Sequence, residues 1–332
     1  AIEKMEGVLN LSIGEPDFDT EPDIIEAAAK AARDGFTHYP PLQGFYDVRE
    51  AVCRYWERHH GLWSKPEEVY MAVGAMQVSH LAFGALLDPG DEVLLVEPCF
   101  PSYFSQVEGN GGVPVAVPTR EESGFAPTVE DLRRAVTPRT RGLLLNSPCN
   151  PSGRVVSRAQ LEEIAAFVQE HDLFALSDEI YESLVFSGEH VCLATLPGMR
   201  ERTLTMGGLS KSHCMTGWRL GYAIGPEEVA RTMTLISASQ TYGLNTLGQK
   251  AALYALDTQD AKLLERRAVF ADRMAAVAER LNSMKGIRCH RAEGAFYLFP
   301  NISGTGLSSE DFAWRLLESA KVGTIPGDAF GK

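Results

Sequence analysis

The sequence predicts an α/β fold, because short apolar runs alternate with helix-like segments along most of the chain. Runs such as EVLLVE and RGLLLN have the length of strands, and the segments between such runs have helical periodicity. Alternation of strand and helix favours a mostly parallel sheet that is covered by helices on both faces. We therefore expect three layers, with the sheet in the middle.

Seven strands are expected in this sheet, each a short apolar run. They span Glu68–Val73, Glu92–Glu97, Val113–Pro118, Arg141–Asn146, Leu173–Asp178, Thr203–Gly208 and Leu220–Gly225. The segment GAMQVSHLAFGALL after the first strand has a helical pattern.

Further helices follow. SRAQLEEIAAFVQEH places its apolar side chains on one helical face, and Ser157 and Gln160 have the spacing of a capping box at its start. Residues 227–283 are chiefly helical in pattern. The last part of the chain mixes an expected strand, AFYLFP at 295–300, with an expected helix at 308–320.

Composition limits the class of protein. The 332 residues suffice for one large domain or two moderate ones, and the net charge of −13 argues against a nucleic-acid or anionic-membrane surface as main partner. The six cysteines form no CxxC pair and no His/Cys cluster, so we expect reduced thiols and no metal. No apolar segment is long enough to span a bilayer, and AIEKMEGVLN lacks a signal-peptide core, so a cytoplasmic location is expected.

Polar motifs follow five of the expected strands. Gly74 follows the first, Pro98-Cys99-Phe100 the second and Asn146 to Gly153 the fourth, whereas Asp178 ends the fifth and Lys211 follows the sixth. The carboxyl ends of parallel strands meet at one edge of a sheet, where ligands bind. The sequence therefore predicts a single site at this edge, with Lys211 in it.

A lysine in such a site can form a Schiff base with a carbonyl compound, and pyridoxal 5′-phosphate (PLP) is commonly held in this way. Asp178 is a candidate to keep the ring nitrogen of PLP protonated. Tyr181 and Asn150 are candidates to bind its ring oxygen, and Phe100 to stack on the ring.

The phosphate of PLP also has candidate ligands. Gly74, Ala75 and Met76 open a helix, whose free N–H groups suit a phosphate. Ser210 and Arg219 add a hydroxyl group and a guanidinium fork.

These residues lie in motifs by which the chain resembles the class I/II aminotransferases, which have the aspartate aminotransferase fold and are fold type I PLP enzymes. The matching segments occur in the family's order over nearly the whole chain: LNLSIGEPDFDT, HYPPLQGFYDVREAV, DEVLLVEPCFPSY, NSPCNPSG, SDEIYE, SKSHCMTGWRLGY and EGAFYLFP. The resemblance implies a PLP-dependent enzyme that moves the amino group of an L-amino acid to a 2-oxo acid.

The resemblance also implies roles for individual residues. Lys211 is the Schiff-base lysine and later a general acid/base, Asp178 the partner of the ring nitrogen and Tyr181 a partner of the ring oxygen. Asn150, Phe100, Ser210 and Arg219 match the family's cofactor ligands. Tyr39 matches a tyrosine that reaches the phosphate of the neighbouring subunit, which implies a homodimer with shared active sites. Gly14 lies where the N-terminal segment crosses the substrate pocket, which Asn150 also borders.

The same resemblance implies a large PLP-binding domain at 36–235. A smaller α+β domain is expected from 1–35 and 236–332 together. The sequence stops at IPGDAFGK, where the family normally continues with a strand that carries an arginine for the substrate's α-carboxylate. We expect either a clipped chain or a carboxylate that is held differently.

Substrate choice is indicated only by Met76, at a position where some aspartate-using relatives place a lysine. A methionine there favours neutral or aromatic amino acids. Two alternative functions remain open: a PLP-dependent carbon–sulfur β-lyase and a non-enzymatic PLP-sensing regulatory domain.

Structural interpretations also remain open for several residues. Phe100 can be a core residue, Asn150 a turn residue and Gly74 a turn glycine, and Tyr39 can be a dimer residue without a phosphate contact. We interpret His213, beside the lysine, as structural.

Overall fold

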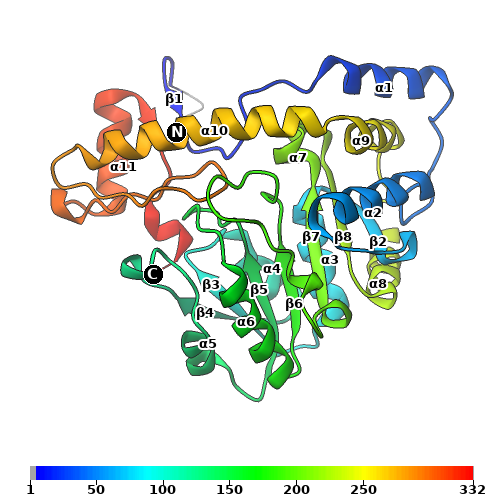
Figure 1. Cartoon of the computed structure of the whole chain (residues 1–332), viewed down its shortest axis with the longest axis horizontal. Helices are drawn as coiled ribbons and strands as arrows, with labels where there is room; N and C mark the ends of the chain where they lie inside the picture. The colour runs from blue at the N-terminus through cyan, green and yellow to red at the C-terminus, as the bar shows by residue number, and fades with distance from the viewer. Residues whose placement is uncertain (1–4, 332) are drawn as a thin grey trace.

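The computed structural model describes residues 5–331, which form an α/β fold of three layers (Figure 1). A seven-stranded sheet has the order β2-β8-β7-β6-β5-β3-β4. Its strands are β2 (Val69–Val73), β3 (Glu92–Glu97), β4 (Val113–Pro118), β5 (Thr140–Asn146), β6 (Phe174–Asp178), β7 (Thr203–Gly208) and β8 (Leu220–Ile224). The seven strands expected from the sequence are thus confirmed, with ends that differ by at most one residue.

One strand of the sheet runs against the others. β8 is antiparallel to both β2 and β7, whereas the remaining pairs are parallel. The amino end of β8 therefore lies at the edge where the other strands have their carboxyl ends. This reversal brings Arg219, which directly precedes β8, to the same edge as Lys211.

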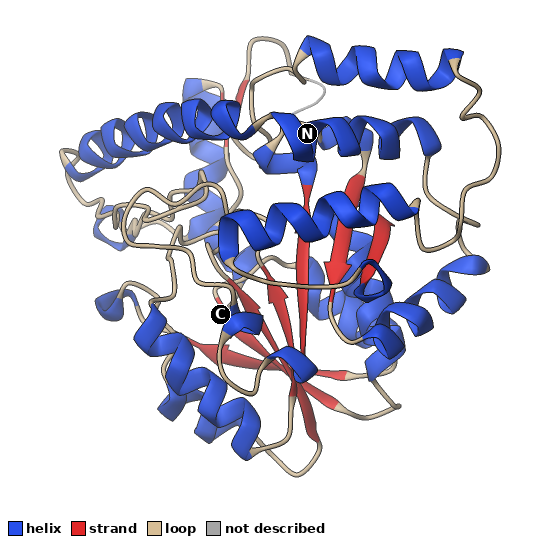
Figure 2. Ribbon diagram, turned by 45° about the vertical axis from the view of Figure 1, so that its right-hand side comes forward, coloured by secondary structure: helices blue, strands red, loops and turns tan. Residues whose placement is uncertain are grey.

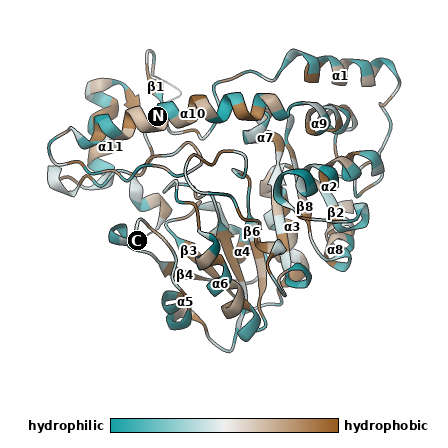
Figure 3. Cartoon of the chain, viewed as in Figure 1, coloured by the Kyte–Doolittle hydropathy of each residue, from teal (hydrophilic) through white to brown (hydrophobic). Residues whose placement is uncertain are grey.

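Helices cover both faces of the sheet (Figure 2). Side chains alternate between the faces, so that Leu94 packs in one core cluster while Val93 and Leu95 pack in another. One face is covered by α3 (Gly74–Leu86), α4 (Ser102–Gly109) and α8 (Glu227–Ala238). The other face is covered by α2 (Tyr46–His60), α5 (Val129–Ala135), α6 (Arg158–Glu170) and α9 (Thr246–Thr258). Figure 3 shows the apolar strands between these more polar helices.

Two short strands near the two ends of the chain pair with each other. β1 (Leu9–Asn10) pairs in parallel with β9 (Val322–Gly323). α1 (Pro22–Arg33) packs beside α9, and the long helix α10 (Asp260–Asn282) runs across the top of Figure 1 toward α11 (Ser309–Ala320). The first and last parts of the sequence therefore share one side of the molecule, above the carboxyl edge of the sheet.

The helices expected from the sequence are present, including α3 after the first strand. The capping box at Ser157 and Gln160 is formed at the start of α6, and α8, α9 and α10 account for the helical pattern of residues 227–283. The expected helix at 308–320 is α11.

The expected strand at 295–300 is wrong. Ala295 has a φ of 58°, which an extended strand does not allow, and only isolated bridges flank the segment, Val185↔Gly294 and Arg288↔Asn301. The aromatic rings of Phe296 and Tyr297 turn instead onto Tyr181. The apolar character of this segment thus reflects packing next to the site rather than a place in a sheet.

All six cysteines are free thiols. No helix among residues 5–331 combines the length and the apolar character needed to cross a bilayer. Within the same residues, no group of three or more His, Cys, Asp or Glu side chains is arranged to hold a metal ion.

Candidate active site

Lys211 lies on a single helical turn, α7 (Leu209–Ser212), which directly follows β7 at the carboxyl edge of the sheet. Its Nζ donates a hydrogen bond to the carbonyl oxygen of Gly14 and lies 6.0 Å from the centre of the Phe296 ring. The N-terminal segment therefore contacts the amine of Lys211 through the backbone of Gly14.

Burial lowers the pKa of the Lys211 amine, and the positive charge of Arg219 lowers it further. The carboxylates of Glu15 and Asp178 act in the opposite direction. A lysine with a lowered pKa has a larger fraction of neutral amine at ordinary pH, and the neutral amine is the form that attacks a carbonyl carbon. The environment of Lys211 therefore suits a nucleophile better than a surface charge.

Asp178 ends β6 and is buried. One of its carboxylate oxygens accepts a hydrogen bond from the hydroxyl group of Tyr103, and the other accepts one from the backbone N–H of Ile180 at 3.1 Å. Burial raises the pKa of Asp178 to about 6, although both hydrogen bonds lower it. The carboxylate is thus held in one orientation but pays a desolvation cost, which a cationic ligand would relieve.

Tyr103 is a site residue that the sequence reasoning missed. It lies on α4, three residues after Phe100, and the two rings meet edge to face with centres 5.6 Å apart. The available signal was its position three residues after the stacking candidate, and in the structure the Tyr103 N–H donates to the Phe100 carbonyl oxygen at 3.2 Å, in the turn that opens α4. Phe100 is half-buried and packs against a core cluster, so it contributes to the core whether or not it also contacts a ligand.

Tyr181 lies in the turn that follows Asp178 at the end of β6. The hydroxyl groups of Tyr181 and Tyr297 lie 2.6 Å apart, and a Cβ atom on Gly14 would collide with the Tyr297 hydroxyl. Glycine at position 14 thus lets the N-terminal segment approach this pair. Burial raises the pKa of Tyr181 well above its ordinary value, so its hydroxyl remains a hydrogen-bond donor.

Asn150 lies in the turn after β5, beside Tyr181. Its backbone N–H donates to the Asn146 side chain at 2.7 Å, and Asn146 in turn donates to the carbonyl oxygen of Asp178 at 3.0 Å. The Asn150 side-chain oxygen is buried and has no hydrogen-bond partner among the described residues. Hydrogen bonds through Asn146 therefore hold the backbone of this turn, whereas the side-chain oxygen of Asn150 remains able to accept a hydrogen bond.

Gly74 and Arg219 lie against each other and form a candidate anion-binding site, called the anion cup below. Gly74 opens α3 with a φ of 74°, and a Cβ atom there would collide with the guanidinium of Arg219. Arg219 also has a positive φ and donates from one terminal nitrogen to the carbonyl oxygen of Thr216 at 2.9 Å. The first N–H groups of α3 and this guanidinium together make a place for an anion. Ser210 is buried beside Lys211, on the same turn.

Three more residues that the sequence analysis discussed differ in exposure. Tyr39 is 82% exposed and meets only the ring of Tyr242 among the described aromatic contacts, with centres 5.3 Å apart. Met76 is 41% exposed near the start of α3, after the half-buried Ala75. His213 is buried, with its Nδ1 2.8 Å from the Ser212 hydroxyl.

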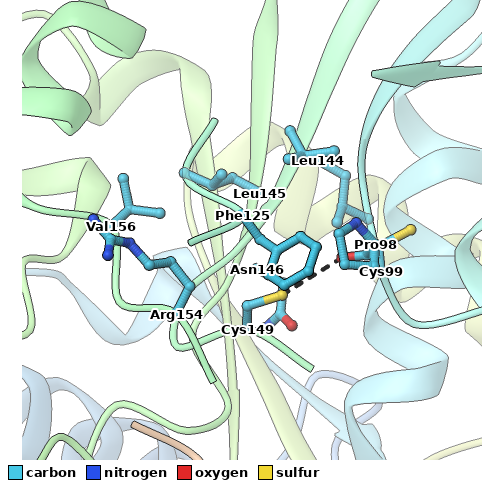
Figure 4. Close-up of a pocket in the computed structure, with 10 residues that line it drawn as sticks. Pro98, Cys99, Phe125, Leu144, Leu145, Asn146, Cys149, Arg154 and Val156 are labelled. Carbon is cyan, nitrogen blue, oxygen red and sulfur yellow. Dashed lines mark hydrogen bonds between the residues drawn. The ribbon is translucent and has the colours of Figure 1, made fainter. Parts of the chain in front are cut away.

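A small cavity lies beneath the strand-end edge, next to the turn that carries Asn150 (Figure 4). Its volume of about 20 Å³ is room for one water molecule, and Pro98, Asn146, Cys149 and Arg154 help to line it. Lys211 and Asp178 do not border it, so the cavity is not a substrate pocket.

Comparisons with known proteins agree on one family. The family described as "Aminotransferase class I and II" matches residues 6–332. An aromatic-amino-acid aminotransferase 2 from Thermococcus litoralis is 42% identical over 332 residues, which cover 99% of this chain and 85% of the relative. An aspartate aminotransferase from Pyrococcus abyssi is similar with the same identity and coverage. The crystal structure of an aromatic aminotransferase from Pyrococcus horikoshii OT3 is 41% identical, with a TM-score of 0.96 over 100% of this chain and 90% of that chain.

Replacing Asp178 tests its buried charge in the protein without cofactor. The folded pKa of about 6 lies above the ordinary 3.8, so between these values the folded state binds more protons and loses stability as the pH rises. The shift corresponds to about 3 kcal/mol at 1.36 kcal/mol per pKa unit. Asp178→Asn removes this loss, so urea unfolding is expected to show the variant gaining up to that amount relative to wild type between pH 4 and pH 7.5.

Glu170→Gln is the matched control for this prediction. Arg133 lowers the pKa of Glu170 on the exposed surface, so this carboxylate contributes stability that is lost as the pH falls. The control is expected to change with pH in the opposite direction to Asp178→Asn. Equal pH dependence in wild type and Asp178→Asn would show that the Asp178 carboxylate is not buried as described.

Proposed function

The chain belongs to the aminotransferase class I and II family, and from this premise we propose that it moves the amino group of an L-amino acid to a 2-oxo acid with PLP anchored at Lys211. The observation that carries the proposal is a buried lysine at a strand end, flanked by a buried acid and by an anion cup. The relatives reported above are named as aminotransferases, which favours transamination over the lyase and the sensor.

The residues of the site fit PLP. Gly74, Ala75, Met76, Ser210 and Arg219 would hold the phosphate, because helix N–H groups, a hydroxyl and a guanidinium are its ordinary ligands. Asn150 and Tyr181 would donate to the ring oxygen, Asn150 from its side-chain N–H group and Tyr181 from its hydroxyl group. Phe100 would cover one face of the ring.

When bound, PLP supplies an electron sink for the electrons that the substrate α-carbon releases. Asp178, held by Tyr103 and the Ile180 N–H, would keep a proton on the pyridine nitrogen. The Lys211 amine would remove the proton from the substrate α-carbon, a task for which its lowered pKa suits it. Gly14 and Asn150 would border the substrate and help to exclude water.

We also propose a homodimer in which Tyr39 reaches the phosphate in the neighbouring subunit. The 82% exposure of Tyr39, beside Tyr242, which is 58% exposed, supports a role outside its own subunit. We propose residues 36–235 as the PLP-binding domain, with 1–35 and 236–332 as the smaller domain. The six free thiols are consistent with a cytoplasmic location.

An absorbance spectrum of the protein with PLP tests the anchor. Wild type is expected to show a band that differs from that of free PLP, because Lys211 is covalently joined to the cofactor. Lys211→Ala is expected to lack this band, whereas Lys250→Ala, which removes a lysine paired with Asp47, is expected to keep it. Single amino acids added without a 2-oxo acid should change the wild-type band and leave one amino group on the cofactor. A band that persists in Lys211→Ala would contradict the assignment.

We further propose that the substrate side chain is neutral or aromatic. Met76 offers an apolar, adaptable contact and no charge for a second carboxylate. The relatives do not decide this point, since an aromatic-amino-acid and an aspartate aminotransferase are equally similar.

Steady-state rates test the side-chain preference. Wild type is expected to use phenylalanine, tyrosine or leucine with higher kcat/KM than aspartate. Met76→Lys is expected to raise kcat/KM for aspartate by roughly tenfold or more, because a hydrogen bond to a charged group contributes about 1.5–3 kcal/mol. Aspartate rates far above the others in wild type would rule out the proposal.

Mixing two inactive variants tests the shared site. If Tyr39 serves the neighbouring subunit, a mixed dimer of Tyr39→Ala and Lys211→Ala chains has one intact site, because the Tyr39→Ala chain keeps Lys211 and receives Tyr39 from its partner. Activity should therefore rise on mixing, by up to about a quarter of the wild-type value for random pairing of equal amounts of chain. Tyr46→Ala, which changes another exposed tyrosine, should be active alone. No recovery in proven mixed dimers would place Tyr39 in its own subunit's site.

A further inference from the structure

Arg266 is a buried arginine on α10 whose guanidinium joins three distant parts of the sequence. One terminal nitrogen donates to the backbone carbonyl of Ser212 at 3.2 Å, and the other donates to the Glu21 carboxylate at 2.8 Å. The Arg266 side chain is only 4% exposed and that of Glu21 25%. Arg266 thus ties the start of α1 to the end of the helical turn that carries Lys211.

The carbonyl groups after Lys211 depend on partners from outside the turn. α7 has only four residues, and the last carbonyls of a helix have no partner within it. Arg266 satisfies the carbonyl of Ser212, which is the residue next to Lys211. The hydroxyl of Thr20 satisfies the carbonyl of Cys214 at 2.7 Å. The N-terminal segment and α10 therefore hold the backbone from which the Lys211 side chain extends.

Stability alone does not explain an ion pair with a buried arginine at this place. Desolvation of the two charges offsets much of their attraction, and well-packed apolar side chains are often as stabilising. What the arginine adds is geometry, since its planar fork fixes two acceptors in one orientation, which a lysine or an apolar side chain cannot do.

We propose that Arg266, oriented by Glu21, is a positioning residue for Lys211. It fixes the C-terminal end of α7 and thereby the direction of the Lys211 amine. This inference rests on the proposed function of Lys211 and concerns only how that amine is held.

The same helix provides a matched control. Arg273, about two helical turns farther along α10, pairs with Asp17 at 2.7 Å and packs on the rings of Phe18 and Phe270. It is 43% exposed, and among the described hydrogen bonds it makes none to α7. Both arginines therefore attach the N-terminal segment to α10, but only Arg266 reaches the turn of Lys211.

The test compares Arg266→Lys, Glu21→Gln and Arg273→Lys by two measurements. The first is the pH dependence of the rate at which apoprotein captures PLP, followed by the absorbance band. Burial lowers the pKa of Lys211, so a loosened α7 that admits water should raise this pKa toward its ordinary value. The midpoint of capture should therefore move to higher pH in Arg266→Lys, by less in Glu21→Gln, and not in Arg273→Lys.

The second measurement separates kcat from KM. Misdirection of the amine should lower kcat of Arg266→Lys by roughly tenfold or more, while KM changes little, because small displacements of a reacting group cost up to about a hundredfold. Glu21→Gln keeps the bond from Arg266 to Ser212 and should fold even where Arg266→Lys does not. Thermal unfolding of each apoprotein reports any loss of the fold.

The outcomes separate this inference from the proposed function. Absence of a Lys211-dependent band in wild type would overturn the proposed function itself. A normal wild-type band with capture midpoints and kcat unchanged in folded Arg266→Lys and Glu21→Gln would overturn only the positioning role. Equal effects in Arg273→Lys would also overturn it, since they would arise from attachment of the N-terminal segment in general.

Discussion

The burial of two opposite ionisable groups at one edge of the sheet is the constraint on which the site depends. Burial lowers the pKa of the Lys211 amine and raises that of the Asp178 carboxyl, so each is pushed toward its neutral form. Neither group tolerates this without specific partners. Tyr103 and the N–H of Ile180 hold Asp178, and the carbonyl of Gly14 holds Lys211. The strand ends position Lys211 and Asp178, and hydrogen bonds from neighbouring segments stabilise these two buried groups.

The loop that carries Lys211 also depends on contacts from segments far away in the sequence, which lie over the sheet edge. The N-terminal segment supplies Gly14 and Thr20, and α10 supplies Arg266, all as contacts to the loop that carries Lys211. Such contacts bridge about 200 residues or join α10 to α7, so the lysine cannot be positioned before most of the chain has folded. The reversed strand β8 adds Arg219 to the same edge. Function at this edge is therefore a property of the whole fold.

The sheet and the central site residues could be predicted from the sequence because their signals are local. Buried strands are short apolar runs, and polar motifs directly after them must meet at one edge, which places Lys211, Asp178 and Asn150. The segment 295–300 has a comparable apolar run, but the positive φ of Ala295 and its single bridges are tertiary features that periodicity does not encode. The pair Arg266–Glu21 was out of reach for the same reason, since nothing local marks partners so far apart. Tyr103 lay within reach, one turn after Phe100.

The opposite pKa shifts also suggest what a cofactor does for the protein. A protonated ring nitrogen beside Asp178 would supply the positive charge that this buried carboxylate lacks, and an anion in the cup of Gly74 and Arg219 would do the converse for the guanidinium. A ligand that binds only the folded state stabilises it by mass action. The burial that shifts both pKa values would thus favour a ligand with a cationic ring and an anionic tail. Burial of these groups lowers the stability of the apoprotein, and a bound ligand that pairs with them would restore it.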